Sequence, residues 1–180
     1  MLTPDKLRDG IFGLNTRRFG TVAEVMVKRL VHLAKGKSLF HDLYDDLQNH
    51  RVEVKFSTVR KKSESIITEA NVLNCIEEEL SENRQVQFNK WHHYEFDCNI
   101  QQVKKAEFEI LYYGLFFYDR ILIFKILSNQ IGSNIFYSDK QHKGNVGEGQ
   151  FHINNKTLEI HLREYLYKDL SYDELLDLLK

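Results

Sequence analysis

Two dense apolar runs in the second half of the chain constrain its fold most: FEILYYGLFF at 108–117 and ILIFKIL at 121–127. Their Ile, Phe and Tyr residues favour β-strands, and apolar side chains at successive positions require cover on both faces of the strand. Neither run approaches the ~20 residues of a membrane span. The runs therefore predict two neighbouring central strands of a sheet that other elements cover on both sides.

Helical and strand patterns surround these two runs. Apolar residues at helical spacing predict a helix from Thr21 to about residue 35, and Glu24 would complete a capping box at its start. Similar patterns predict strands at 40–44, 51–59 and 158–162, helices at 63–80, 100–106 and 173–180, and irregular segments at 84–98 and 128–149. Without repeats or a long linker, this order predicts one α/β domain over residues 1–180, with a central mixed β-sheet flanked by helices.

The charge balance excludes a protein that coats nucleic acid with its whole surface. Lys and Arg number 25 and Asp and Glu number 26, so the formal net charge is −1 and a polyanionic partner would need a local basic patch. Cys75 and Cys98 form no Cys-x-x-Cys pair, which argues against a zinc ribbon or a disulfide framework. The first residues, MLTPDKLRDG, contain no apolar signal core. We expect a soluble, cytoplasmic protein with no membrane partner.

The segment 38–59 carries the most informative polar residues. In a strand, side chains alternate between faces, so Glu53 and Lys55 point one way while Val54 and its apolar neighbours point the other. This acidic-x-Lys pattern occurs only once in the chain. Asp42 lies 11 residues before Glu53 on the partner arm of the predicted hairpin, where its carboxylate can reach that of Glu53.

Two carboxylates on neighbouring strands are hard oxygen ligands that suit Mg²⁺. Asp42 and Glu53, with the backbone carbonyl of Val54, would form such a metal site. Lys55 could then orient or deprotonate a water molecule, or stabilise charge on an attacked phosphate. The alternative is a surface hairpin with a cross-strand ion pair and no catalytic role.

Two assignments within this site stay open in the sequence. Asp45 and Asp46 compete with Asp42 as the first metal ligand, although the DDLQNH segment favours a turn for both of them. Glu24 is either a supporting carboxylate of the metal site or the third residue of a capping box that begins at Thr21.

Asp42, Glu53-Val54-Lys55 and the following Phe56-Ser57 resemble the PD-(D/E)xK nuclease superfamily and, within it, the type II restriction endonucleases. The resemblance spans roughly residues 20–160, including the stretch 141–153, but only the hairpin motif is specific, and His41 stands where the motif has proline. In this family a further carboxylate often lies on the helix before the hairpin, where this chain has Glu24.

The resemblance implies a restriction-endonuclease-like core and a hydrolase that depends on Mg²⁺. Such an enzyme cuts double-stranded DNA at a specific short sequence and leaves 5′-phosphates, most simply as a homodimer on a palindromic site. It also implies a possible cognate DNA methyltransferase encoded nearby. The alternatives are a structure- or damage-directed nuclease of the same superfamily and a non-catalytic DNA-binding α/β module.

Basic and amide side chains outside the hairpin are candidates for DNA contacts, because cations meet phosphates and amides suit base edges. An ordinary solvated surface is the competing interpretation for each of them. The candidates are Arg60, Lys61, Gln101, Gln102, Lys104, Lys143, Asn145, Gln150 and His152.

Overall fold

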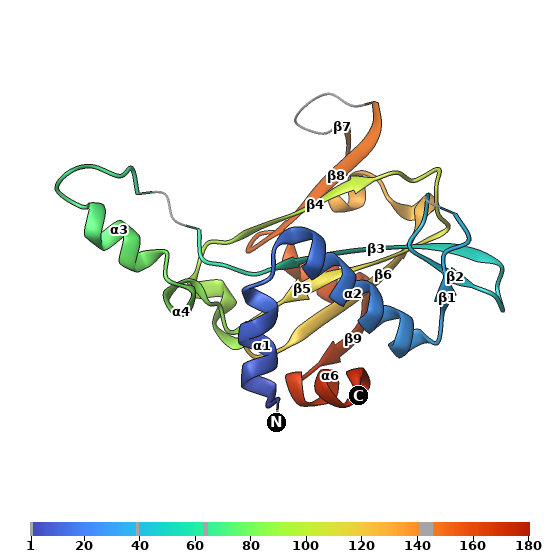
Figure 1. Cartoon of the computed structure of the whole chain (residues 1–180). Helices are drawn as coiled ribbons and strands as arrows, with labels where there is room; N and C mark the ends of the chain where they lie inside the picture. The colour runs from blue at the N-terminus through green and yellow to red at the C-terminus, as the bar shows by residue number, and fades with distance from the viewer. Residues whose placement is uncertain (1, 39, 63–64, 141–145) are drawn as a thin grey trace.

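The computed structural model describes residues 2–38, 40–62, 65–140 and 146–180, and its centre is a mixed six-stranded sheet flanked by helices (Figure 1). The strands are β1 (Ala34–Lys35), β2 (Leu43–Asp45), β3 (His50–Thr58), β5 (Ile110–Phe116), β6 (Ile121–Leu127) and β9 (Leu166–Leu170). They lie in the order β1-β2-β3-β5-β6-β9, with β3 and β5 parallel and the other neighbours antiparallel. The predicted α/β class with a mixed central sheet is confirmed.

The central strands β5 and β6 are covered on both faces, as the two apolar runs predict. Every residue of β5 is buried. One face packs against α1 (Pro4–Phe12), α2 (Thr16–Val31) and α6 (Tyr172–Leu179). The other face packs against α5 (Leu158–Glu164) and a second sheet of β4 (Asp97–Val103), β8 (Val146–Asn154) and β7 (Ser138–Lys140), in the order β4-β8-β7.

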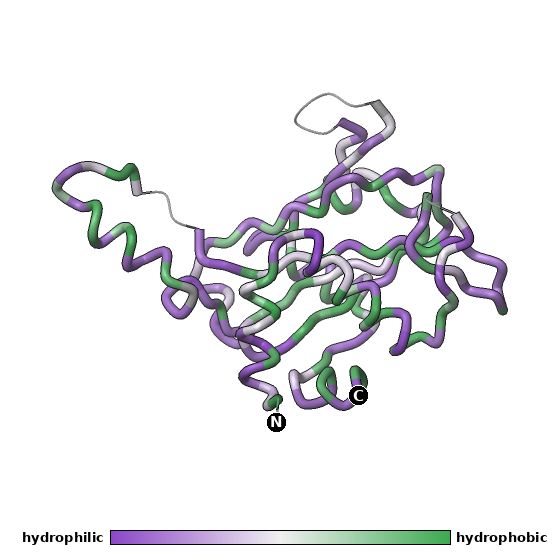
Figure 2. Tube along the Cα trace, viewed as in Figure 1, coloured by the Kyte–Doolittle hydropathy of each residue, from purple (hydrophilic) through white to green (hydrophobic). Residues whose placement is uncertain are grey.

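A smaller helical part extends away from the two sheets. It contains α3 (Val72–Glu78) and α4 (Ser81–Arg84), and Figure 1 shows α3 projecting from the body. Short 3-10 helices complete the described structure: η1 (Phe88–His93), η2 (Ser128–Gln130) and η3 (Ser133–Ile135). Figure 2 shows apolar positions along the projecting part, where Leu73 and Ile76 are exposed. In the described part of the chain, no helix has the length and apolar character to cross a membrane.

The second helix begins earlier than the capping pattern predicts. Asn15 is its N-cap, because the side chain of Asn15 accepts a hydrogen bond from the backbone N–H of Arg18. Thr21 lies inside the helix and donates its hydroxyl to the carbonyl of Arg17. The capping role of Glu24 is therefore wrong, since Glu24 lies in the middle of α2. The capping box predicted at Ser171, by contrast, is confirmed at the start of α6.

Two predicted elements have the opposite type. The segment 100–106, predicted to be helical, belongs largely to β4, where a β-bulge places the buried Ile100 and Val103 three residues apart and so imitates helical spacing. The segment 158–162, predicted as a strand, is helix α5. His161 and Leu158 are both fully buried in this helix. The strand prediction used the apolar residues alone, so it left out the buried histidine that completes the helical pattern.

Other boundaries also differ from the prediction. The arm expected at 40–44 is β2, which begins at Leu43. Of the helix expected over 63–80, the described residues 65–80 form only α3, and residues 63–64 lie outside the described residues. The segment 128–149, predicted as irregular, contains β7 and the beginning of β8. Residues 141–145 of that segment lie outside the described residues.

Candidate active site

The hairpin of β2 and β3 brings Asp42 close to Glu53, because Asp42 directly precedes the first residue of β2. Leu43 is paired with Val52, and β2 pairs with β3 no further along β3. Just before β2, Asp42 accepts a hydrogen bond from the backbone N–H of Val54 at 2.9 Å from its Oδ2. The carboxylate of Asp42 thus occupies the place that a backbone carbonyl would have taken on the edge of β3.

Hydrogen bonds join residues 36–38 to His41 and Asp42. The N–H of Gly36 donates to the carbonyl of Asp42 at 3.0 Å. The ring of the buried His41 accepts from the N–H of Lys37 at 3.3 Å and lies 3.1 Å from the hydroxyl of Ser38. His41 therefore connects Lys37 and Ser38 to the start of the hairpin by hydrogen bonds.

Glu53 and Lys55 form an ion pair on the open face of β3. Their side chains are only 12% and 25% exposed, and the ammonium of Lys55 contacts Oε1 of Glu53. Burial raises the pKa of Glu53 to about 7, although Lys55 acts to lower it, and the nearby carboxylate of Asp42 raises it further. The positive charge of Lys55 therefore does not fully compensate for the burial of the Glu53 carboxylate and for the negative charge of Asp42.

Glu24 reaches the same site from α2. Burial raises the pKa of Glu24, the charge of Asp42 raises it further, and Lys55 and Lys35 lower it. Glu24 of α2 thus interacts electrostatically with Asp42 and Lys55 of the hairpin, although it does not line the same pocket as these two residues.

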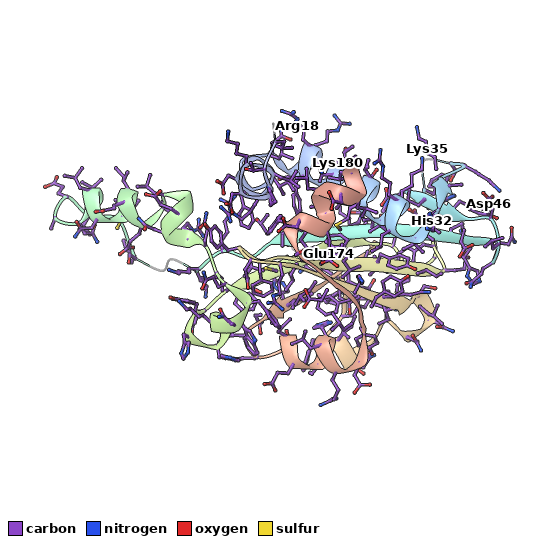
Figure 3. All side chains as sticks on the ribbon, turned by 90° about the horizontal axis from the view of Figure 1, so that it is seen from below. Arg18, His32, Lys35, Asp46, Glu174 and Lys180 are labelled. Atoms are coloured by element: carbon purple, nitrogen blue, oxygen red, sulfur yellow. The ribbon has the colours of Figure 1, made fainter. Side chains whose placement is uncertain are left out.

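Asp45 and Asp46 belong to the turn, as the sequence favours. Oδ1 of Asp45 accepts from the backbone N–H groups of Leu47 and Gln48, which is the hydrogen bonding of an Asx turn. Asp46 pairs with Lys37 at 3.1 Å, and Figure 3 shows it at the tip of the hairpin. Asp42 is therefore the aspartate that faces Glu53.

A polar pocket of about 240 Å³ opens over these residues. Among the described residues, its carboxylates are Asp42, Glu53, Glu107 and Glu148, and its ammonium groups are those of Lys55 and Lys104. The volume lies below the ~300–1,000 Å³ of sites that enclose a small organic molecule. The excess of carboxylates among these described residues would repel an anionic substrate, and a bound cation would reduce this repulsion.

The donor atoms of this pocket fit Mg²⁺. Oδ1 of Asp42 and Oε2 of Glu53 have no hydrogen bond within the described part of the chain, because only the other oxygen of each carboxylate is used. In residues 2–38, 40–62, 65–140 and 146–180, no three His, Cys, Asp or Glu side chains gather as a metal site. Mg²⁺ needs no such cage, since it commonly binds one or two carboxylates and completes its shell with water and phosphate oxygens.

The candidate DNA-binding residues separate into two groups, the first of which adjoins the pocket. Gln102 and Lys104 line the pocket itself, and Lys104 pairs with Glu148 at 3.3 Å. Gln101 and Arg60 line the next groove along β3, where Arg60 donates to the carbonyl of Phe12 at 2.8 Å.

The second group lies elsewhere or is already paired. Lys61 borders a separate hollow beside α3 and α4, with its ammonium over the ring of Tyr94. Gln150 accepts from the side chain of Asn99, and His152 pairs with Asp97 at 2.9 Å. Lys143 and Asn145 lie outside the described residues.

Sequence reasoning missed His41, Glu107 and Glu148 as members of the pocket. Glu148 lies in the glycine-bearing stretch that the sequence singles out, but no spacing rule connects it to Glu53. Its position depends on the pairing of β4 with β8, a contact between distant segments.

Comparison with known proteins adds no relative. The sequence matches no protein-family model, and it has no significant match among curated proteins or solved structures. A functional assignment therefore depends on the residues and the geometry of the chain itself.

Proposed function

We propose that this protein is a Mg²⁺-dependent DNA endonuclease of the restriction type, with a restriction-endonuclease-like core. One observation carries the proposal: Asp42, Glu53 and Lys55 meet at the edge of β3, in a pocket whose described lining residues include more carboxylates than cations. That arrangement suits a metal and a phosphate arriving together. It is not needed for an ordinary surface ion pair.

In this proposal Asp42 and Glu53 hold the Mg²⁺, with the carbonyl of Val54 as a further oxygen. The bound metal would supply positive charge to the phosphate and lower the pKa of a coordinated water. Lys55, released from its pairing with Glu53, orients the attacking water or accepts its proton. Glu24 acts through its charge on Asp42 and Lys55 rather than as a direct ligand.

The proposed reaction is hydrolysis of a phosphodiester in double-stranded DNA. The water oxygen forms a bond to phosphorus while the bond from phosphorus to the 3′ oxygen breaks, leaving a 5′-phosphate and a 3′-hydroxyl. Two copies of the chain related by a two-fold axis would cut both strands of a palindromic site. A cytoplasmic setting with a cognate methyltransferase encoded nearby belongs to the same proposal.

Digestion of a sequenced plasmid tests the function directly. We expect the wild-type chain to cut it with Mg²⁺ and not with EDTA, and Lys55→Ala to lower the rate at least about 100-fold, because a positioned proton-transfer group contributes about that much. Lys156→Ala, which removes an exposed lysine outside the pocket, is the matched control and should cut normally.

The fragment ends distinguish the related functions. Cuts at one short sequence would support a restriction enzyme, whereas cuts at mismatches, flaps or ends would support a structure-directed nuclease with the same site. If the wild-type chain does not cut DNA, or if Lys55→Ala cuts as fast as wild type, the proposed function is wrong.

A further inference from the structure

Strand β4 contains a β-bulge beside the catalytic pocket. In its pairing with β8, Ile100 lies opposite Phe151 and Val103 opposite Gly149, so β4 has one extra residue at this point. Within the bulge, Gln102 has a φ of 57°. This left-handed conformation is unfavourable for a residue that carries a side chain, and glycine would adopt it at lower cost.

The bulge changes which side chains face the open side of β4. In a regular strand, successive side chains point to opposite faces. Here Gln101 and Gln102 are both exposed between the buried Ile100 and Val103. Gln102 lines the catalytic pocket, and Gln101 lines the next groove along β3. Two successive amide groups thus lie along one path beside the edge of β3.

Neighbouring residues hold the bulge in place. The hydroxyl of Tyr137 donates to the carbonyl of Val103 at 3.1 Å. The ring of Tyr137 lies so close to Gly149 that a side chain there would collide with it. Directly after the bulge, Lys104 is paired with Glu148 and Glu107. The strained conformation is therefore fixed by its surroundings, which is typical of strain retained at functional sites.

We propose that this bulge presents Gln101 and Gln102 to a DNA strand lying along the edge of β3. Gln102 contacts the nucleotide at the reacting phosphodiester, and Gln101 contacts the adjacent nucleotide. A neutral amide suits this place, because it donates to phosphate or pairs with adenine without adding negative charge to an acidic pocket. The inference rests on the proposed nuclease function and adds to it two substrate-binding residues and a reason for the strain.

The test uses a substitution that should increase stability while it decreases cleavage. Gln102→Gly should raise the midpoint of thermal unfolding by roughly 1–3 °C, because it relieves the strain, and should lower kcat/KM for DNA about tenfold or more. Gln102→Ala should lose the same activity without the gain in stability. Gln101→Ala, at a residue with ordinary φ, should also lower kcat/KM without raising stability.

His32→Gly is the matched control, because His32 has a φ of 59° at the C-terminal end of α2 and lines none of the pockets above. It should raise the unfolding midpoint in the same way and leave cleavage unchanged. If wild type cuts DNA and both Gln102 variants cut at its rate, the inference is wrong while the nuclease function stands. If wild type neither cuts nor binds DNA, both are wrong.

Discussion

At the scale of the residue, Glu53 is held in surroundings that suit its charged form poorly. Its burial and the nearby Asp42 raise its pKa, and the single ammonium of Lys55 does not compensate for them. A divalent cation would supply the missing positive charge. The pH dependence of the stability of the metal-free protein therefore reports on the environment of Glu53 without an activity assay.

Glu53→Gln is expected to stabilise the metal-free protein at pH 8. The folded-state pKa of about 7 lies above the unfolded value of about 4.5, so the folded state binds more protons between these values and its stability falls as the pH rises through them. The variant should escape this loss and gain roughly 3 kcal/mol on wild type between pH 4.5 and 8. Chemical denaturation at several pH values measures the change.

Mg²⁺ provides the second part of this measurement. It should raise the unfolding midpoint of wild type, because the proposed metal site exists only in the folded state, and it should have much less effect on Glu53→Gln. Glu69→Gln, an exposed control, should behave as wild type in both experiments. Stability curves of wild type and Glu53→Gln that run parallel in pH would contradict the assigned environment of Glu53.

At the scale of the element, the hairpin could be predicted from the sequence and the strand across the pocket could not. Alternation along β3 is a local property, so the common face of Glu53 and Lys55 follows directly from their spacing. The bulge in β4 is not local in this sense. It gives a strand the three-residue spacing of a helix, and the pairing with β8 that reveals it joins segments about 50 residues apart.

Gly36→Ala should separate Asp42 from the edge of β3. A Cβ at Gly36 would lie 2.9 Å from the carbonyl oxygen of Asp42 and still closer to that of His41, so the backbone must move. We expect a loss of about 1–3 kcal/mol of stability and a larger loss of cleavage with Mg²⁺. Thermal unfolding and plasmid cleavage measure the two effects.

Gly20→Ala is the matched control for this substitution. Gly20 lies inside α2, and a Cβ there would have no atom within 4 Å, so the change should add about 0.5–1 kcal/mol of stability and preserve cleavage. Normal cleavage by Gly36→Ala would show that the loop does not position Asp42 for the reaction.

At the scale of the whole molecule, the central sheet separates two apolar cores, and the candidate site lies where the sheet ends between them. The core beside the second sheet contains His161, which is fully buried with its Nδ1 2.8 Å from the hydroxyl of Tyr113. Burial lowers the pKa of His161 to about 4. Two-sided cover of the sheet was predictable from its apolar runs, but a histidine in the core was not.

His161 should make the whole fold sensitive to acid. The unfolded state takes up a proton near pH 6.5 and the folded state only near pH 4, so stability falls by roughly 3 kcal/mol as the pH decreases through this window. His161→Asn keeps an acceptor for Tyr113 and removes the titration, so its stability should fall less steeply with acid. Urea denaturation from pH 7 to 4 measures the slopes.

The exposed His92 supplies the control for this measurement. His92→Asn should follow the wild-type slope, because this side chain is exposed and lies outside the buried core. Equal slopes for wild type and His161→Asn would contradict a neutral histidine in the core.

The start of β2 at Leu43, opposite Val52, has one further consequence, for aggregation. It leaves the edge of β3 beyond Val52 without a neighbouring strand on that side among the described strands, and such an edge can recruit a strand from another molecule. Here the edge carries Glu53 and Lys55, and the carboxylate of Asp42 already occupies the N–H of Val54. The same charges that would serve the proposed chemistry thus also disfavour edge-to-edge pairing, so a chain that lost them would need another way to avoid aggregation.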